Sequence, residues 1–388
     1  MARIVRTLQL GFLDTSGANV PKTVLITGGC GFIGRHLTDE LLAGGYAVRV
    51  LDSLVEQVHA EGGFRGDDRA HYIFGDLRDR DTVREALAGV DCVVHLAAEV
   101  GVGQSMYEIA RYVGGNDLGT AVLLEELIDR PVERIVVASS MSVYGEGLYQ
   151  SRDGNRADGA RRSRRQLIQG QWDLYDEKGQ PLIAVPTDED KRIDLASIYA
   201  LTKFAQEQAV LIFGEAYKVD AVALRLFNVF GPGQALGNPY TGVLANFAAR
   251  LANGNPPLIF EDGEQRRDFV HVKDVARAFR LALEKPQAAG HAINIGSGDS
   301  YSIRRVAALV AEALGRPDVE PEILGKMRAG DIRNCFADLG KARELLGYEP
   351  RHRLEDSLGE FAAWVADVGA SDRSAEMRAL LEKRGLVS

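Results

Sequence analysis

Short apolar runs alternate with amphipathic stretches along the chain from residue 22 onward. The stretches between most of these runs have helical spacing, as in Phe32–Ala43 and Leu118–Ile128. Short apolar strands that alternate with amphipathic helices form a parallel, doubly wound sheet. We therefore expect an α/β fold whose sheet contains Thr23–Thr27, Ala47–Asp52, Tyr72–Asp76, Cys92–Leu96, Arg134–Ser139 and Ala221–Leu226.

Two regions break this alternation. Residues 146–192 are polar and rich in turn residues, which predicts an insertion. After Phe227, turns and short strands mix with helices expected at Val243–Ala252, Val275–Leu283 and Ser302–Leu314, which favours a smaller, mixed α/β lobe. The domain prediction is an N-terminal extension over 1–20, the main sheet domain over 21–227 with a probable return over 268–290, and the second lobe over 228–267 and 291–388.

Bulk properties narrow the function without naming it. The 388 residues suffice for two domains or for one large domain with a smaller lobe. A formal net charge of −9 argues against general binding to nucleic acids or anionic membranes, and no apolar run approaches a membrane span. Three cysteines with no paired spacing fit a reducing compartment, here the cytoplasm, and indicate neither a disulfide framework nor a metal site.

A glycine-rich turn follows the first expected strand and precedes the first expected helix. Gly28, Gly31 and Gly34 leave room for a tight turn and for a pyrophosphate at the helix N-terminus. Asp52, at the end of the second strand, can bind a ribose 2′-hydroxyl and would repel a 2′-phosphate. The pattern predicts a Rossmann-type domain that binds NAD. Asp76 could reach the adenine or could merely cap the next helix.

A second motif points to proton transfer. Tyr199 and Lys203 are one helical turn apart, so the Lys203 ammonium, with a nicotinamide cation, could lower the pKa of Tyr199. The serines around Ser140 follow a strand, at the sheet edge where α/β enzymes place their sites. Tyr-x-x-x-Lys alone is common in helices. When the motif follows a dinucleotide turn and a strand that ends in serines, as it does here, it becomes a specific indication of a proton-transfer site.

These motifs resemble those of the extended short-chain dehydrogenases/reductases, in particular the nucleotide-sugar epimerases and dehydratases. The resemblance runs from about Lys22 to about Gly359 and is interrupted by the insertion. Besides the glycine turn and Tyr199–Lys203, the motifs that carry it are His95–Ala98, Ser139–Gly145, Arg225–Pro232, Arg267–Val272 and Asn294–Gly296.

The resemblance implies specific roles. Ser140, Tyr199 and Lys203 would be catalytic, Asn116 would support the site, and His95 would be structural. The implied cofactor-binding residues are Gly28, Gly31, Phe32, Ile33, Gly34, Asp52, Asp76, Leu77, Leu96, Ala97, Ala98, Asn116, Ser139, Tyr199 and Lys203. The implied substrate-binding residues are Ser140, Met141, Ser142, Asn228, Val243, Phe260, Arg267, Arg328 and Asp331.

Within the resembled family, the residues after Ser140 discriminate between reactions. Dehydratases carry Asp-Glu where this chain has Met141 and Ser142, and decarboxylases usually carry Glu at the second position. Without an added acid or base, the simplest chemistry is epimerisation: NAD takes a hydride from sugar C4 and returns it to the other face. A 4,6-dehydratase, a 4-ketoreductase and a non-catalytic NAD-binding regulatory protein are the alternatives.

The insertion adds a hint about the substrate. Some relatives with a similar insertion carry two Cys-x-x-Cys turns, where this chain shows Ser151…Gly154 and Tyr175…Lys178, so no zinc is expected. Relatives with such insertions resemble deoxysugar enzymes such as dTDP-L-rhamnose 4-epimerases, which favours a dTDP-hexose and leaves UDP-hexoses open. The insertion could cover the sugar pocket, extend a dimer surface, form a solvated loop, or use its arginines at 161–165 to dock nucleic acid or protein.

The resemblance also implies an assembly. Relatives form homodimers through the helix that carries Tyr199 and the helix expected at Leu118–Ile128, which together build a four-helix bundle. We therefore expect a homodimer.

Overall fold

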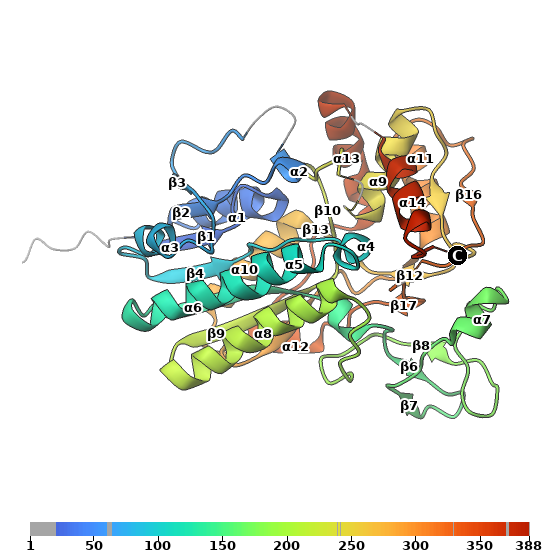
Figure 1. Ribbon diagram of the computed structural model, residues 1–388, viewed down its shortest axis with the longest axis horizontal. Coiled ribbons are helices and arrows are strands. Elements are labelled where there is room, and N and C mark those ends of the chain that lie inside the picture. The colour runs from blue at the N-terminus through green and yellow to red at the C-terminus, as the bar shows by residue number, and fades with distance from the viewer. Residues whose placement is uncertain are drawn as a thin grey trace, which may run out of the picture.

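A seven-stranded parallel sheet forms the centre of the computed structural model, which describes residues 21–59, 64–238, 240, 242–328, 330–369 and 372–387 (Figure 1). The expected doubly wound sheet is confirmed. The expected N-terminal extension, residues 1–20, lies outside the described residues. In spatial order the strands are β14 (Ala292–Ile295), β9 (Asp220–Leu226), β5 (Arg134–Ser140), β4 (Cys92–His95), β1 (Thr23–Thr27), β2 (Ala47–Asp52) and β3 (His71–Phe74).

Both faces of this sheet are buried, which explains why its strands are apolar throughout. Successive residues of a strand point to opposite faces. On β1, Val24 and Ile26 enter one core cluster and Leu25 enters the other, and all three are fully buried. Burying each such side chain stabilises the fold by about 1.5–3 kcal/mol.

Helices cover the two faces of the sheet. On one face α1 (Phe32–Ala43) packs against α10 (Val272–Glu284). The other face carries α3 (Arg80–Ala86), α6 (Gly119–Asp129) and α8 (Ile198–Tyr217), with α6 and α8 side by side (Figure 1). Shorter elements at the sheet domain are α2 (Glu56–His59), α4 (Val102–Ser105), α5 (Ile109–Tyr112), the 3₁₀ turns Met141–Tyr144 and Pro286–Ala288, and α12 (Gly340–Leu346).

The helix expected at Leu118–Ile128 has an irregular beginning. The regular helix α6 starts at Gly119, and Val113–Leu118 before it form a π-helical turn. Single π-helical turns are frequent at functional sites, because the wider ring rotates one side chain out of the α-helical pattern. Here the buried side chain of that turn is Asn116.

A smaller lobe with its own core packs beside the carboxyl edge of the sheet. Its core joins residues such as Phe247, Phe269 and Phe361, all nearly inaccessible to solvent. The strands of this lobe are β10 (Asn228–Phe230), β11 (Leu258–Ile259), β12 (Arg266–Arg267), β13 (Phe269–His271), β15 (Tyr301–Ser302), β16 (Glu322–Ile323) and β17 (Asn334–Cys335). Its helices are α9 (Val243–Ala252), α11 (Ile303–Ala313), α13 (Leu354–Val368) and α14 (Ser374–Lys383).

One predicted domain boundary needs correction. Residues 291–388 were assigned to the second lobe, yet β14 pairs with β9 and forms the edge of the main sheet. Helix α12 packs on β14, so part of this region also belongs to the sheet domain. The error arises because a single four-residue strand gives no signal of which sheet it joins; that choice depends on long-range pairing.

The predicted insertion forms a small structure of its own. Strands β6 (Tyr149–Gln150), β7 (Arg156–Ala157) and β8 (Ile183–Ala184) make a three-stranded sheet, and α7 (Arg164–Ile168) lies beside it (Figure 1). The insertion touches the second lobe through the bridge between Thr187 and Ala337. Across the described ranges of the chain, no helix has the length and apolar character needed to cross a membrane.

Candidate active site

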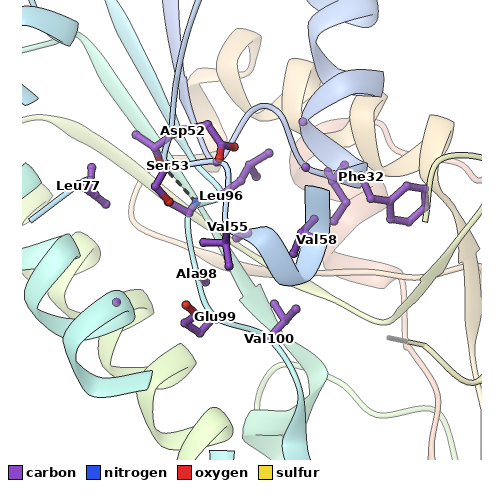
Figure 2. Close-up of a pocket in the computed structure, with 18 of the residues that line it drawn as sticks. Phe32, Asp52, Ser53, Val55, Val58, Leu77, Leu96, Ala98, Glu99 and Val100 are labelled. Atoms are coloured by element: carbon purple, nitrogen blue, oxygen red, sulfur yellow. Dashed lines mark hydrogen bonds between the residues drawn. The ribbon is translucent and has the colours of Figure 1, made fainter. Parts of the chain in front are cut away.

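A cavity of about 420 Å³ opens at the carboxyl ends of β1, β2, β4 and β5 (Figure 2). Figure 2 shows Asp52 and Ser53 at one end, Glu99 and Val100 at the opposite end, and Phe32 on the α1 side. The structure brings together at this cavity every residue predicted to bind the cofactor, except Asn116: Gly28, Gly31, Phe32, Ile33, Gly34, Asp52, Asp76, Leu77, Leu96, Ala97, Ala98, Ser139, Tyr199 and Lys203.

Each glycine of the turn occupies a position where glycine is favoured for a different structural reason. Gly28 has a φ of +70°, and a Cβ there would lie 2.8 Å from the backbone of Ala97. A Cβ on Gly34 would lie 2.4 Å from Gly29 Cα, so Gly34 lets α1 pack onto the turn. Gly31 caps α1 with no side-chain hydrogen bond to the first amides. The start of α1 is therefore suited to a pyrophosphate, and the cradle fits a dinucleotide.

Asp52 is fixed at the end of β2 by backbone amides. Its two carboxylate oxygens accept hydrogen bonds from the Cys30 amide at 2.9 Å and from the Leu54 amide at 2.8 Å. His59 lies 3.9 Å from the same carboxylate, and burial lowers the pKa of this histidine. The negative charge of Asp52 thus lines the cavity in a fixed position, as expected for a residue that selects NAD over NADP.

Asp76 lines the same cavity and does not cap the next helix. Its carboxylate accepts hydrogen bonds from the Arg78 amide at 2.8 Å and from the Arg78 guanidinium, which lowers the pKa of Asp76. Helix α3 is capped by Asp79, whose side chain accepts from the amide of Asp81. The capping alternative is therefore wrong, and a role of Asp76 at the adenine end stays a prediction.

Asn116 supports the site from behind the cavity. Its amide nitrogen donates to Thr202 Oγ1 at 2.9 Å and to the carbonyl oxygen of Glu99 at 3.2 Å, and its oxygen accepts from the Glu99 amide. The side chain is fully buried. Asn116 therefore joins the π-helical turn, the chain after β4 and helix α8, and it does not line the cavity.

His95 is a buried structural residue in this protein. Its ring nitrogens lie 2.7 Å from Thr27 Oγ1 and 2.8 Å from Thr120 Oγ1. Burial lowers its pKa to about 3, so the ring is neutral at physiological pH. His95 also lies 3.2 Å from Gln206 Nε2, which connects it to the lysine of the proton-transfer motif.

Ser140, Tyr199 and Lys203 meet at the inner end of the cavity. The backbone amide of Tyr199 is held by Ser105 Oγ at 3.0 Å. Burial raises the pKa of Tyr199, and a hydrogen bond with Ser140 partly opposes this. Lys203 Nζ donates to Gln206 Oε1 at 2.8 Å, and burial lowers the pKa of Lys203 to about 7. Among the groups of the chain itself, burial is the main cause that shifts the pKa of Tyr199. The expected lowering also requires the nicotinamide cation and stays a prediction.

The side chains of Ser139 and Met141, at and just after the end of β5, form hydrogen bonds with neighbouring segments of the protein. Ser139 Oγ donates to Glu207 Oε2 at 2.6 Å, and Glu207 forms a buried ion pair with Arg225 at 2.6 Å. Met141 Sδ accepts from Asn228 Nδ2 at 3.5 Å. Neither Met141 nor Ser142 lines either of the two cavities described here, so their predicted substrate contacts are not assembled in the structure.

A second cavity of about 280 Å³ lies in the smaller lobe and gathers the other predicted substrate residues: Asn228, Val243, Phe260, Arg267, Arg328 and Asp331. The two cavities use neighbouring residues of the same segments, such as Asn228 with Val229 and Val100 with Val102. The two cavities together are named the cleft.

The two arginines of the second cavity are held in different ways. The Arg267 guanidinium donates to the carbonyl oxygens of Ile332 at 2.6 Å and Arg333 at 3.0 Å, which orient its charge without neutralising it. Arg328 pairs with Asp331 at 2.8 Å and lies 5.1 Å from the ring centre of Phe260. Phe260, predicted to contact the nucleobase, thus makes a cation–π contact with Arg328.

Sequence motifs did not reveal two elements that line the cleft. Gln57 on α2 donates to Gln104 Oε1 at 3.0 Å and to Asn238 Oδ1 at 3.1 Å, and Asn238 lines the same cavity. Gln57 thus connects α2 to α4 and to the segment around residue 238. Helix α14 contributes Met377 and Arg378 to the second cavity. The sequence signal of both helices is weak, because α2 has only four residues and α14 bears no motif of the resembled family.

In the part of the chain that the structure describes, no three His, Cys, Asp or Glu side chains gather in a way that could hold a metal ion. The two turns compared with Cys-x-x-Cys positions are closed by backbone bonds, such as Gly154 to Ser151 at 2.9 Å and Gly179 to Asp176 at 3.0 Å.

A glycine-lined cavity of this kind, at the carboxyl edge of a doubly wound sheet, defines a dinucleotide-dependent α/β enzyme. The NAD dependent epimerase/dehydratase family matches residues 24–296, and the chain belongs to this family. The predicted family, fold and NAD cofactor are confirmed.

Three relatives illustrate this likeness. The chain is 36% identical to a dTDP-L-rhamnose 4-epimerase of Burkholderia thailandensis over 352 residues, which are 89% of this chain and 95% of that protein. A UDP-glucose 4-epimerase of Thermotoga maritima, solved with UDP-glucose, is 30% identical with a TM-score of 0.72, covering 89% and 99%. A UDP-glucuronic acid 4-epimerase of Bacillus cereus, solved with UDP-glucuronic acid and NAD, is 26% identical with a TM-score of 0.73, covering 89% and 99%. These relatives are isomerases, as predicted for this chain.

Proposed function

We propose that this protein is an NAD-dependent nucleotide-sugar 4-epimerase that acts on a dTDP- or UDP-hexose. The observation that carries the proposal is the pair of lining sets: Ser140 and Tyr199 line the first cavity, and Arg267 and Arg328 line the second. The proposal takes the two cavities as parts of one binding site. A nucleotide sugar needs both halves, because its diphosphate requires cations and its hexose must reach the proton-transfer residues.

In this proposal Tyr199 and Ser140 transfer one proton to and from the sugar and orient its C4 hydroxyl. Tyr199 Oη removes the proton of the C4 hydroxyl, and Ser140 Oγ shares the hydrogen bond. NAD would be held by the glycine turn and Asp52, and it would supply reversible hydride acceptance at C4 and a positive charge near Tyr199. Tyr199 returns its proton to the C4 oxygen, which thereby becomes the hydroxyl of the product. Lys203, beside Tyr199, can hold the nicotinamide ribose.

The absence of extra acids beside Ser140 favours epimerisation over dehydration. Eliminating water from C5 and C6 requires an acid and a base close to the sugar. Positions 141 and 142 carry a thioether and a hydroxyl, and Ser142 Oγ is buried without a hydrogen-bond partner in the described structure. A 4-ketoreductase is less consistent with Asp52, because net biosynthetic reduction usually draws on NADPH.

The first experiment is to incubate the purified protein, without added cofactor, with a panel of dTDP- and UDP-hexoses and to follow the products by NMR. Inversion at C4 without net NADH formation would support the proposal and identify the sugar. Accumulation of a 4-keto product or of stoichiometric NADH would contradict it. A dTDP-hexose is the first candidate, in keeping with the function of the Burkholderia relative.

We also propose that the protein is a homodimer. Apolar side chains are exposed on the neighbouring helices α8 and α6 and on the π-helical turn before α6, among them Leu118 at 53%, Leu201 at 46% and Ile212 at 63%. Exposed apolar side chains that share one face mark protein–protein interfaces. A second copy of the same face would cover them and build a four-helix bundle.

We propose the cytoplasm as the compartment in which the protein acts. The cysteines Cys30, Cys92 and Cys335 are free and buried, which suits a reducing environment.

A further inference from the structure

The insertion is joined to the second lobe by a buried group of charges, which we call the Arg162 cluster: Arg162, Glu146, Glu261 and Arg333. The side chain of Arg162 is 3% exposed and that of Glu261 is 1% exposed. Arg162 belongs to the arginine run of the insertion, yet it points into the protein. Its neighbour Arg161 pairs with Asp194, so two arginines of the run are engaged within the protein.

Arg162 connects three segments that are far apart in the sequence. Its Nε donates to Glu146 Oε1 at 3.0 Å, its Nη1 to Glu261 Oε1 at 2.6 Å, and its Nη2 to the carbonyl oxygen of Asp331 at 3.1 Å. Hydrogen bonds between buried charges are strong, and removing one partner leaves the other charges without compensation.

Two of these segments carry residues of the substrate cavity. Glu261 follows Phe260 directly, and Asp331 itself lines the cavity and pairs with Arg328. Glu146 Oε2 accepts a hydrogen bond from the Arg333 amide at 2.7 Å, so the same cluster also places the chain after Asp331.

The carbonyl oxygens of that chain hold the second cavity arginine. Arg267 donates to Ile332 and Arg333 carbonyls, so the position of residues 331–333 sets the position of its guanidinium. The insertion contributes no residue to either cavity described here, and it can influence them only through such contacts.

Backbone geometry supports the same conclusion. Glu261 has a φ of +53°, a left-handed conformation that is costly for a residue with a side chain. Its carboxylate is held by Arg162 and Arg333, and its amide donates to the Lys326 carbonyl at 2.9 Å. Strain of this kind persists only where surrounding contacts over-determine the conformation.

We infer that Arg162 is a positioning residue for nucleotide-sugar binding, through which the insertion sets the placement of Arg267, Arg328 and Phe260. The inference rests on the proposed function, because it takes the second cavity as the nucleotide-sugar site. It assigns the insertion a structural task at the substrate pocket, distinct from a lid, a metal ribbon or a solvated loop.

The test compares Arg162→Met with Arg165→Met, which removes the same charge from an exposed position of the same arginine run. Binding of dTDP and of UDP to the NAD-loaded protein is measured by calorimetry, together with NAD content and steady-state turnover. For Arg162→Met we expect at least tenfold weaker binding of the nucleotide that wild type binds and a raised KM. NAD content and kcat should stay within about threefold of wild type. Arg165→Met should behave as wild type.

The outcomes separate this inference from the proposed function. If wild type binds neither nucleotide, the proposed function fails. If wild type binds one and Arg162→Met binds it equally well, or if only kcat falls, the positioning role of Arg162 is wrong.

Should Arg162→Met not fold, Arg162→Lys takes its place, since an ammonium cannot satisfy three separated acceptors at once. The inference would be supported if Arg162→Lys, with full NAD content, bound the nucleotide three- to tenfold more weakly than wild type does. Wild-type affinity would overturn it.

Discussion

At the scale of single residues, the active site contains buried titratable groups whose charged forms are disfavoured by burial. Tyr199 has its pKa raised by burial, and Lys203 has its pKa lowered by the same cause. Both shifts favour the neutral form, and they are the expected effect of removing a titratable group from water. Tyr199 is thus a poor base until positive charge is added beside it.

Replacing Tyr199 by phenylalanine removes only the hydroxyl that transfers the proton. We expect turnover to fall at least about 10³-fold, within the range that general acid–base groups supply. NAD content and the melting temperature should stay close to wild type. Tyr217→Phe, on the exposed part of the same helix, is the matched control. Near-normal turnover of Tyr199→Phe would disprove the mechanism.

Asp52→Asn tests the choice of cofactor while keeping one oxygen, which can accept a hydrogen bond from either the Cys30 or the Leu54 amide. Loss of the negative charge should reduce discrimination against NADP by at least about tenfold, because repulsion of the 2′-phosphate disappears. Competition binding of NAD and NADP measures the effect, with Asp68→Asn as an exposed control. Unchanged discrimination would show that Asp52 does not select the cofactor.

The buried amine of Lys203 should also make stability depend on pH. Folding lowers its pKa from 10.5 to about 7, so the unfolded chain binds more protons between these values. Stability therefore rises with pH over this window, and the full cost of burying the ammonium is present below about pH 7. Lys203→Met should raise the free energy of unfolding of the cofactor-free protein at pH 6 by about 1–3 kcal/mol and flatten the rise.

Urea unfolding of the cofactor-free protein between pH 6 and pH 9 measures this effect. Lys178→Met, at an exposed turn of the insertion, should leave the pH dependence unchanged. An equal pH slope in Lys203→Met and wild type would mean that Lys203 stays charged in the folded protein.

At the scale of elements, helix α14 gives the substrate cavity one of its walls. It contributes Ser374, Met377 and Arg378 to that cavity, and Leu381 anchors it in a small apolar cluster with Tyr107, Tyr240 and Phe260. This cluster is separate from the large cores of the two lobes. The apolar attachment of α14 therefore depends on this small cluster of its own.

Leu381→Ala should weaken nucleotide binding more than global stability. Truncating a fully buried leucine costs about 2–5 kcal/mol locally, enough to loosen the docking of α14. We expect KM to rise several-fold with unchanged NAD content, as measured by steady-state kinetics and by absorbance of released cofactor. Lys383→Ala, on the exposed side of α14, should have no effect. An unaltered KM would show that α14 is not needed at the pocket.

At the scale of the whole molecule, two exposed apolar surfaces are candidates for the interface of the proposed homodimer. One is the exposed apolar face shared by α8 and α6, and the other is the insertion, which exposes Ile168 at 68%. The first surface lies on the helix that carries Tyr199 and Lys203, so association there would brace the catalytic helix.

Ile212→Asp should convert the dimer into a monomer, because a buried carboxylate at a bundle interface has no compensating charge. Light scattering coupled to size exclusion gives the molar mass, and Ile168→Asp serves as the control. A monomeric Ile168→Asp beside a dimeric Ile212→Asp would place the interface on the insertion. A monomeric wild type would remove the assembly proposal.

The amino-acid sequence was sufficient to predict the sheet, the cofactor turn and the side chains at strand ends that line the first cavity. These features depend on local signals: strand-length apolar runs, glycines that a turn requires, and side chains at strand ends, such as Asp52 and Ser140. Each signal lies within a few residues of the feature that it predicts, so no knowledge of distant contacts was needed.

The way in which distant segments meet became visible only in the folded structure. There β14 joins the main sheet, Arg162 is buried between the insertion and the second lobe, α14 lines the substrate cavity, and burial raises the pKa of Tyr199. Strand pairing, ion pairing and desolvation depend on residues up to hundreds of positions apart, and their energies arise only once the chain has folded.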